Sequence, residues 1–483
     1  MTEPEARHAS AGEQPQAPPL GRRETTPDRL PGICLARVAG FKSITDERAI
    51  EIRPLTILAG ANGSGKSSMM QPLLLLKQTL QASYDPGPLL LDGPHVTFTS
   101  FAQLLSRRGA EGSERAFSVG LAGEAGQLLT TTYVQRSNHA ITIAKMVQVH
   151  GSHTTELRLG MTHDEVERQL PKPVRKLALA LSTRGKASRV ELRWSVVRSR
   201  CFLWVAATPQ GEPESRLGET SIPLTSPAGV FELYLRDLIH LPALRGTPER
   251  SYRISATSGE FQGTFDNYAA SIIAWWWDNR DSEKLEALNQ DLRHLGLASG
   301  VEPRRVADTR VELRVGSPAH RGRGIGQLKV NIADVGFGVS QALPVLVALR
   351  VAEKGQLVYL EQPEIHLHPY AQVRLADVLI DAANRGVRVV AETHSALLLL
   401  GIQARVAQGM IPPGNTKLHW FSLGRDGTTN IASADFDELG RYGEWPEDFG
   451  RIELEASREY LDAVAQRLQE TQGDSGGPEA FSH

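Results

Sequence analysis

The segment GANGSGKS at residues 60–67 constrains the fold of this chain more than any other stretch. It fits the phosphate-loop pattern of Gly, four free positions, Gly-Lys, and then Ser or Thr. An apolar run at 55–59 leads into it and an amphipathic pattern follows from Ser68, so the sequence predicts a strand, a glycine loop and a helix. In that arrangement backbone N–H groups and the helix N-terminus converge on the phosphates of a nucleoside triphosphate, because glycines let the backbone approach closely.

Side chains of this loop have separate expected roles. Lys66 is predicted to reach across the phosphates, and Ser67 to offer its hydroxyl to Mg²⁺. An ordinary glycine-rich turn is the alternative explanation of the pattern. The predicted nucleotide-binding residues of this stretch are Gly60, Asn62, Gly63, Ser64, Gly65, Lys66, Ser67 and Ser68.

The composition argues against several other classes of protein. The chain has 483 residues, enough for about two or three domains or for one domain with a long insertion. Its formal net charge of -2 predicts no chain-wide affinity for nucleic acid, so any basic surface must be local. Cys34 and Cys201 are the only cysteines, which predicts neither a disulfide framework nor a cysteine metal cluster. No apolar stretch approaches the roughly 18 residues that span a bilayer, so we expect no membrane segment and a cytoplasmic location.

The order of the predicted elements indicates an α/β nucleotide-binding core that is interrupted by a mixed α+β insertion. Segments between 116 and 159 alternate in the manner of antiparallel strands, and buried strands and helices of the core return from 328 onward. The predicted divisions are a disordered tail at 1–31, the first half of the core at 32–110, the insertion at 111–324, the second half of the core at 325–432, a C-terminal element at 433–470 and a disordered tail at 471–483.

Two stretches of the predicted insertion have an unusual composition. Between Arg168 and Arg200 there are many basic residues and a single acidic one, Glu191. A solvated helix face and hairpin explains this charge, and a surface that contacts the phosphates of DNA is the alternative. The three consecutive indoles at 275–277 fall in a predicted helix and cannot all face one core. Core packing and a domain or subunit contact both remain open for them.

Two predicted buried strands in the second half end in polar residues. The strand at 357–361 ends in Glu361, which we expect to act as the acidic Mg²⁺ ligand that accompanies a phosphate loop. The strand at 389–393 is followed by His394, which is well placed to contact a γ-phosphate or its attacking water. His366 and His368 have a spacing that suits a metal, but no third ligand is evident, so we favour a loop whose histidines buttress the neighbouring site.

A further segment, DVGFGVSQ at 334–341, opens a predicted helix with small residues. It forms a second potential anion site, and simple capping of the helix by Ser340 is the alternative. Together with GFKS at 40–43, these segments resemble the ABC-type ATPase heads of the SMC, RecF and overcoming-lysogenisation-defect group. The resemblance is strongest to prokaryotic AAA-family ATPases that carry EQPEIHLHP, ETHS and a C-terminal domain of unknown function, and it covers residues 33–105, about 240–265 and 325–450.

The resemblance implies ATP and Mg²⁺ as cofactors. It places Lys42 and Ser43 beside the nucleotide, and it places Gly338 and Ser340 in the signature that would contact the γ-phosphate of a partner subunit. Further implied elements are a D-loop at 363–368, a switch histidine at His394, a Leu-Gly-Pro-Leu-Arg element at 241–245 and a C-terminal Trp-Pro motif at 443–449.

One departure from the family pattern bears on catalysis. Gln362 occupies the position where ABC-type ATPases keep their catalytic glutamate. Because glutamine cannot accept a proton from water at neutral pH, we expect slow hydrolysis and a long-lived ATP-bound state. Glu364, Glu392 or His394 would then supply the base catalysis. The predicted catalytic residues are Lys66, Gln362, Glu364 and His394.

The resemblance also implies an ATP-dependent homodimer that acts as a switch. We expect a role in a DNA-related or anti-phage defence process, with a separate effector such as a nuclease or toxin and DNA contact through Arg168–Arg200. A nucleotide-gated binding or scaffold protein with negligible turnover is the second hypothesis, which Gln362 favours. The ATP-binding subunit of a transporter is the third, and it fits less well because the insertion is long and the signature degenerate.

Overall fold

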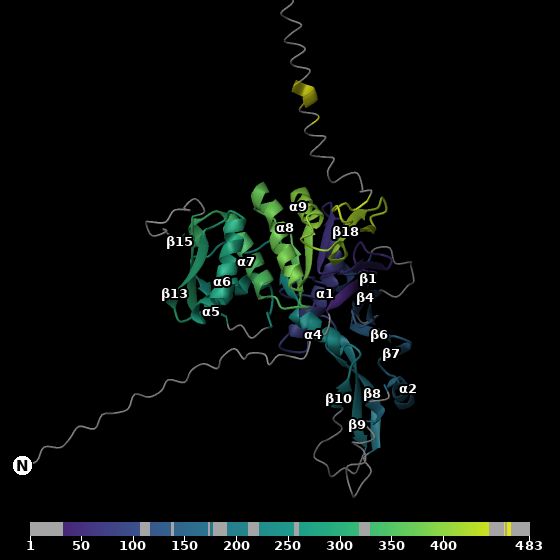
Figure 1. Cartoon of the computed structure of the whole chain (residues 1–483). Helices are drawn as coiled ribbons and strands as arrows, with labels where there is room; N and C mark the ends of the chain where they lie inside the picture. Colours follow the sequence, from purple (N-terminus) through teal and green to yellow (C-terminus); the bar gives the residue numbers. More distant parts are fainter. Residues whose placement is uncertain are drawn as a thin grey trace, which may run out of the picture.

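The computed structural model describes residues 32–106, 116–136, 140–171, 174–176, 191–210, 222–255, 260–317, 329–443, 458 and 461–464. In these ranges a parallel sheet and an antiparallel sheet enclose the helix that follows the glycine loop (Figure 1). The predicted tails lie outside the described residues, as do residues 444–449 of the predicted Trp-Pro motif and most of the predicted C-terminal element after them. No helix within the described ranges is long and apolar enough to cross a membrane.

The parallel sheet carries the glycine loop, and its strand order is β11-β16-β17-β3-β18-β19. Neighbouring strands from β11 to β18 run parallel, and β19 pairs antiparallel with β18. β3 and β17 are buried along their whole length, as central strands with both faces covered should be. The strands are β3 (Leu55–Gly60), β11 (Ile239–Leu241), β16 (Leu357–Glu361), β17 (Arg388–Thr393), β18 (Thr416–Leu423) and β19 (Thr429–Asp435).

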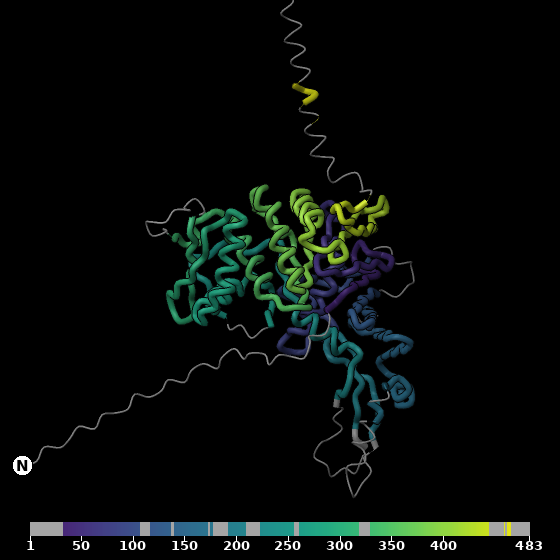
Figure 2. Tube along the Cα trace, in the orientation of Figure 1, coloured from purple at the N-terminus to yellow at the C-terminus, as the bar shows by residue number. Residues whose placement is uncertain are grey.

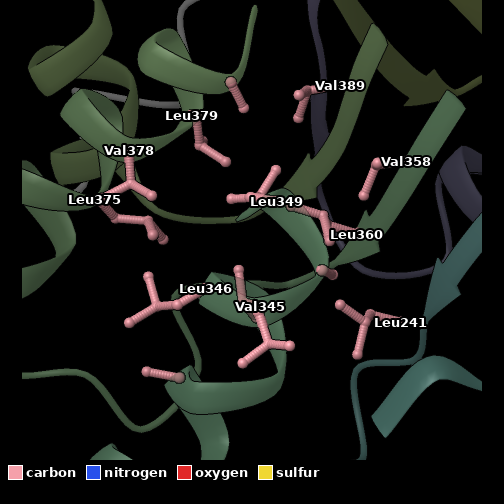
Figure 3. Close-up of a cluster of buried hydrophobic side chains, with 14 of the residues drawn as sticks. Leu241, Val345, Leu346, Leu349, Val358, Leu360, Leu375, Val378, Leu379 and Val389 are labelled. Atoms are coloured by element: carbon pink, nitrogen blue, oxygen red, sulfur yellow. The ribbon is translucent and has the colours of Figure 1, made fainter. Parts of the chain in front are cut away.

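Three helices cover one face of this sheet: α7 (Phe337–Val351), α8 (Pro369–Asn384) and α9 (Ala396–Ala407). Burial of their apolar side chains, which contributes about 25 cal/mol per Å², fixes them against the strands. The packed side chains drawn in Figure 3 are Leu241, Val358, Leu360 and Val389 of the strands, Val345, Leu346 and Leu349 of α7, and Leu375, Val378 and Leu379 of α8.

Helix α1 (Lys66–Gln81) lies on the other face, between the parallel sheet and the antiparallel sheet β2-β1-β4-β5-β6-β7. Residues 73–76 are four consecutive buried leucines, because this helix is covered on both sides rather than exposed along one face. β4 to β7, predicted as part of an insertion from 111, pair onto β1 and so extend its sheet. The strands are β1 (Ile33–Ala39), β2 (Arg48–Glu51), β4 (Ala116–Gly123), β5 (Gln127–Gln135), β6 (Ile141–His150) and β7 (His153–Leu157).

An arm projects from the C-terminal end of α1 in the lower part of Figure 1. Two cations of the basic stretch hold it there. Arg198 forms an ion pair with Asp85, and Arg200 donates from Nη1 to the carbonyl of Thr79 at 3.0 Å. Lys172, Arg184, Lys186 and Arg189 of the same stretch lie outside the described residues. The arm comprises α2 (His163–Gln169), β8 (Glu191–Ser199), β9 (Phe202–Gln210), β10 (Ile222–Thr225) and α4 (Gly229–Asp237).

A second lobe lies between β11 and β16 in the chain, on the left of Figure 2. α5 supplies its core, where Trp276 is fully buried, while Trp277 is 47% exposed and Trp275 half-buried. Core packing therefore explains the middle indole and leaves Trp277 on the surface. The lobe contains β12 (Tyr252–Arg253), η2 (Phe265–Tyr268), α5 (Ala269–Asp278), α6 (Ser282–His294), β13 (Gly300–Ala307), β14 (Arg310–Gly316) and β15 (Lys329–Asn331), and α7 leads back to the sheet.

Candidate nucleotide-binding site

The glycine loop connects β3 to α1 in a backbone conformation that needs glycine. Gly60, Gly63 and Gly65 have φ angles of 144°, 74° and 101°. A Cβ on Gly65 would lie 2.1 Å from Oγ1 of Thr429, at the start of β19, whereas a Cβ on Gly63 would meet nothing within 4 Å. The loop is therefore packed against Thr429 at Gly65 and leaves open space at Gly63, where a phosphate group could approach the backbone.

Lys66 begins α1 and is held by the loop itself. Its Nζ donates to the carbonyls of Gly60 and Ala61 at 3.0 and 2.9 Å. Burial lowers the pKa of Lys66, and the charges of Glu392 and Glu364 partly offset this effect. The ammonium group thus lies against the loop backbone, near the carboxylates of Glu392 and Glu364. Its position fits the expected contact with phosphate oxygens.

Ser67 and Glu392 join α1 to the end of β17. Ser67 Oγ donates to both carboxylate oxygens of Glu392, at 2.9 and 3.1 Å. The phenol of Tyr359 donates to Oε2 of Glu392 at 2.8 Å. Burial raises the pKa of Glu392, and the hydrogen bond from Tyr359 counteracts part of that rise. Glu392, predicted only as an alternative base, is the carboxylate that contacts the predicted Mg²⁺ hydroxyl.

Glu361 lies one strand further from the loop. It is the parallel partner of Glu392 in the β16–β17 register, so both carboxylates lie at the same edge of the sheet. Its Oε1 pairs with Nε2 of His240 and its Oε2 accepts from the N–H of Ala243, each at 3.2 Å. Burial raises the pKa of Glu361, but the hydrogen bonds from His240 and Ala243 and the charge of Arg245 oppose burial, so that the pKa lies below its usual value. The role of Glu361 as a Mg²⁺ ligand stays a prediction.

Glu364 and His394 form the remaining part of the site. Oε1 of Glu364 accepts from Thr393 Oγ1 at 2.6 Å and from the N–H of His394 at 3.1 Å. Its Oε2 is buried and has no hydrogen-bond partner among the described residues. Burial raises the pKa of Glu364 and lowers that of His394. A buried carboxylate oxygen without a donor is suited to accept a proton from water.

Gln362 adopts an unusual backbone conformation directly after β16, with a φ angle of 43°. Its N–H donates to the carbonyl of Glu392 at 2.8 Å, and its carbonyl accepts from Arg245 Nη2 at 3.3 Å. Left-handed backbone is rare for a residue other than glycine, and such positions cluster at functional loops. His366 in the same loop also has a positive φ, of 63°.

Lys42 and Ser43 lie beside the loop, and their expected contact with the nucleotide stays a prediction. Lys42 donates from Nζ to Gln71 Oε1 at 2.6 Å, and Ser43 Oγ accepts from Oγ1 of Thr429 at 2.8 Å. A cavity of about 740 Å³ opens between Lys42, Ser43 and Ser68 on one side and residues 426–428 of the β18–β19 turn on the other. Its size and its place next to the phosphate loop suit the nucleoside part of a nucleotide.

The predicted signature segment at 334–341 leads into α7 and contacts the predicted D-loop rather than the glycine loop. Gly336 is the N-cap residue of α7, and Ser340 donates from Oγ to the carbonyl of Phe337 at 2.9 Å, so Ser340 is not the cap. A Cβ on Gly338 would lie 3.3 Å from the carbonyl of His366 in the predicted D-loop. Neither Gly338 nor Ser340 hydrogen-bonds to the glycine loop in the described part of the chain.

Sequence reasoning missed four residues of this site: Gln71, His240, Tyr359 and Thr429. Tyr359 was detectable in principle, since it lies two residues before Glu361 on one strand and so faces the same side. The other three carry no spacing signal. His368, expected to buttress the site, instead caps α8 by accepting from the N–H of Tyr370.

The residues present fit a nucleoside triphosphate with Mg²⁺. The loop offers an open backbone face at Gly63 and a lysine, while Ser67, Glu392 and Glu361 supply the oxygen donors that Mg²⁺ prefers. Buried oxygens of Ser64 and Glu364 have no protein partner among the described residues. No group of three or more His, Cys, Asp and Glu side chains in the described ranges is arranged to hold a metal ion by itself. A metal here would therefore need the phosphates as additional ligands.

The fold and site define an α/β protein of the P-loop nucleotide-binding class, which confirms the fold predicted from the sequence. A family model described as "AAA domain, putative AbiEii toxin, Type IV TA system" matches residues 242–400. The matched segment includes the second lobe, β16 and β17 but not the glycine loop. A comparison with curated proteins finds no significant match.

Solved structures of SMC head domains are similar to this chain. An SMC head bound to the C-terminal winged-helix domain of ScpA is 13% identical, with a TM-score of 0.44 over 84% of this chain and 99% of that chain. The SMC head domain from Thermotoga maritima is 11% identical, with a TM-score of 0.33 over 83% and 98%. An SMC head with an extended coiled coil from Pyrococcus furiosus is 13% identical, with a TM-score of 0.39 over 90% and 100%. These values are too low to assign a function to this chain.

Proposed function

We propose that this protein is an ABC-type ATPase head that binds Mg²⁺-ATP and hydrolyses it slowly. The observation that carries the proposal is the convergence of Lys66 and Ser67 of the glycine loop with Glu392 and Glu364 at the carboxyl ends of neighbouring strands. This is the edge of a parallel sheet at which phosphates and metals bind. The match to an AAA domain over residues 242–400 agrees with it.

Each side chain has a defined part in this proposal. With nucleotide bound, Lys66 would exchange its loop carbonyls for phosphate oxygens, while Ser67 and the carboxylates of Glu392 and Glu361 would hold Mg²⁺. Bound Mg²⁺ would neutralise charge on the phosphates. Glu364, through its unpartnered Oε2, accepts the proton of the attacking water in place of Gln362. His394 donates to the γ-phosphate.

In this proposal ATP hydrolysis is slow for two reasons. The base, Glu364, is buried, and it lies two residues after position 362, where ABC-type ATPases keep their catalytic glutamate. Glu364 is 7% exposed and its pKa is raised by burial, so ionisation costs free energy. A carboxylate is nevertheless present, so some turnover is expected. We therefore favour a slow ATPase over a scaffold without turnover.

We further propose that two copies of the chain dimerise around ATP. Gly338 and Ser340 lie on α7, whose contacts are with the second lobe and the D-loop rather than with the phosphates. In an ABC-type dimer they would face the phosphate loop of the partner subunit. Phe337 in this segment is 53% exposed and Tyr370 near the start of α8 is 55% exposed, so each leaves apolar surface for a partner to cover.

The dimer would serve as a switch in a DNA-related or anti-phage defence process in the cytoplasm. The description of the matched family includes a toxin and a toxin–antitoxin system, which favours a defence role and a separate nuclease or toxin as effector. DNA contact would involve the exposed Arg175 and Lys176 of the basic stretch rather than Arg198 and Arg200, which are engaged with Asp85 and Thr79.

A single set of measurements tests the ATPase proposal. Wild type, Lys66→Ala and the exposed-site control Lys354→Ala are compared for ATP binding, phosphate release and mass by light scattering. We expect binding, slow release and an ATP-dependent dimer in wild type and in the control, and none of these in Lys66→Ala. A monomer with ATP, or equal ATP binding by Lys66→Ala, would contradict the proposal.

The defence role needs its own test. Cells that carry the gene with its chromosomal neighbours are challenged with phage, beside cells that carry the Lys66→Ala variant. Protection that depends on Lys66 supports the role. Equal plaque numbers in all strains would overturn it without affecting the ATPase proposal.

A further inference from the structure

Two buried histidines connect the segment after α1 to the carboxylate of Glu361. His240 on β11 is 1% exposed. Its Nε2 lies 3.2 Å from Glu361 Oε1 and its Nδ1 lies 3.0 Å from Nδ1 of His95. The imidazole of His240 also stacks on the ring of Tyr359, with 5.4 Å between centroids and 11° between planes. Both ring nitrogens of His240 are therefore occupied, and its ring plane is fixed.

Hydrogen-bond chemistry defines which nitrogen carries the proton. An ionised carboxylate only accepts, so the Nε2 of His240 must donate to Glu361. A neutral His240 then has a bare Nδ1, which accepts from the Nδ1–H of His95. This leaves the buried Nε2 of His95, which has no partner among the described residues, as an unsatisfied acceptor rather than an unsatisfied N–H. Since buried orphan donors are the rarer case, this tautomer pair is the favoured one.

His95 is in turn fixed by α1. Gln78 accepts from the N–H groups of His95 and Val96 at 3.2 and 3.0 Å, and donates to the carbonyls of Leu90 and Val96 at 2.6 and 3.1 Å. A Cβ on Gly93 would lie within 2.6 Å of the Gln78 side chain, so this turn fits closely around it. The same helix that begins with Lys66 and Ser67 therefore also sets the position of His95, three turns later.

Hydrogen bonds and one ring contact therefore connect α1 to both carboxylates of the site. At its start α1 contacts Glu392 through Ser67, and further along it contacts Glu361 through Gln78, His95 and His240. Tyr359 bridges the two branches, since it donates to Glu392 and stacks on His240. Both carboxylates of the site are thus oriented from the phosphate-loop helix.

We propose that His240, locked in one tautomer by His95, is a positioning residue that holds the Glu361 carboxylate in the geometry required for Mg²⁺ and so favours Mg²⁺ over Ca²⁺. Mg²⁺ demands near-ideal octahedral geometry, whereas Ca²⁺ accepts variable ligand geometry. Partners that orient a metal-binding side chain are worth roughly 10–100-fold in metal affinity. The inference rests on the proposed function, because it takes Glu361 as a ligand of nucleotide-bound Mg²⁺.

The test uses the full chain and two matched substitutions. His240→Gln keeps an N–H donor near the position of Nε2, whereas His240→Asn keeps a polar group near Nδ1 and loses the donor to Glu361. Binding of a fluorescent ATP analogue is titrated with Mg²⁺ and separately with Ca²⁺. We expect His240→Asn to raise the half-saturating Mg²⁺ concentration about 10–100-fold and the Ca²⁺ value much less. His240→Gln should stay close to wild type.

Several outcomes are distinguishable. If wild type binds the analogue with Mg²⁺ and His240→Asn has the same half-saturating Mg²⁺ concentration, the inference fails and the proposed function stands. Equal weakening for Mg²⁺ and Ca²⁺ in both variants would show a merely structural role and also overturn it. If wild type shows no metal-dependent binding, both proposals fail. Should His240→Asn not fold, His95→Gln, which moves the amide away from Nδ1 and so removes the donor to His240, decides the question with a smaller expected shift in the same direction.

Discussion

The hydroxyl of Ser67 donates to the carboxylate of Glu392, with Oγ–Oε distances of 2.9 and 3.1 Å. These residues are 325 positions apart in the chain and meet because β17 lies directly beside β3. The contact brings a carboxylate with a raised pKa next to the predicted metal hydroxyl. Glu392 thereby becomes as strong a candidate for Mg²⁺ coordination as Glu361.

Replacing Glu392 by glutamine tests this role. Glutamine retains an oxygen that can accept from Ser67 and Tyr359 but lacks the negative charge that attracts a cation. We expect Glu392→Gln to lower the affinity for Mg²⁺ roughly 10–100-fold in nucleotide-binding titrations, with little loss of thermal stability. The exposed control Glu438→Gln should behave as wild type. Unchanged Mg²⁺ dependence would exclude Glu392 as a ligand.

Glu364→Gln tests the proposed base. The substitution keeps the acceptor for Thr393 Oγ1 but removes the group that takes the proton, so phosphate release should fall about 10²–10⁴-fold while ATP binding persists. Burial raises the pKa of Glu364 above 4.5, and a base acts only when ionised. Wild-type turnover should therefore increase as pH rises through that elevated pKa, and this limb should vanish in the variant. An identical pH profile in both proteins would rule Glu364 out.

Gln362→Glu tests proton transfer from the attacking water by adding a base instead of removing one. The substitution introduces a carboxylate at the position where the ABC-type ATPases that the sequence resembles keep their base, and general bases typically contribute 10²–10⁴-fold. We expect faster phosphate release and a shorter-lived ATP-dependent dimer, measured by single-turnover assays and light scattering. A rate equal to that of wild type would mean that residue 362 does not limit hydrolysis.

Alanine substitutions at Gly65 and Gly63 can be compared to test how closely the loop packs against Thr429. Both have positive φ angles, so alanine at either position incurs a conformational cost of about 1–2 kcal/mol. Only at Gly65 would the new Cβ also collide with Thr429 Oγ1, at 2.1 Å. Gly65→Ala should therefore lower Tm more than Gly63→Ala, and Thr429→Ala should recover part of the difference. Equal Tm values for the two glycine variants would contradict the observed packing.

Local sequence signals predicted the core elements well. The glycine loop, the buried strands that end at Glu361 and before His394, and helices α7, α8 and α9 all follow from patterns within a few residues of each other. β3, β16 and β17 are apolar because they lie in the centre of a parallel sheet with both faces covered. Such continuous apolar runs can be recognised in one amino-acid sequence.

Contacts between distant segments could not be predicted in the same way. Nothing in the sequence states that β17 rather than β16 pairs with β3, and this strand order is what places Glu392 next to Ser67. Pairing of β4 with β1 and the contact between His95 and His240 likewise depend on tertiary packing. Gly338 and Ser340 make no hydrogen bond to the glycine loop within the described residues, and their contact with a second subunit stays a proposal.

His419 gives the fold a pH dependence that is independent of the nucleotide site. It is 1% exposed on β18, where its two ring nitrogens pair with Ser433 Oγ at 2.7 Å and with the carbonyl of Glu51 at 2.9 Å. Burial lowers its pKa to about 4, and the charge of Lys417 adds to this effect, while the bond to Glu51 opposes it.

The folded protein therefore excludes a proton that the unfolded chain binds near pH 6.5. Stability from this residue is fully present above that pH and should fall by roughly 3 kcal/mol as the pH decreases toward 4. His419→Gln keeps a donor for the Glu51 carbonyl but does not titrate. Chemical denaturation at pH 7.5, 6 and 5 should show a shallower loss of stability in the variant, because His95 and the other titrating groups are common to both proteins. Parallel curves for the two proteins would contradict this assignment.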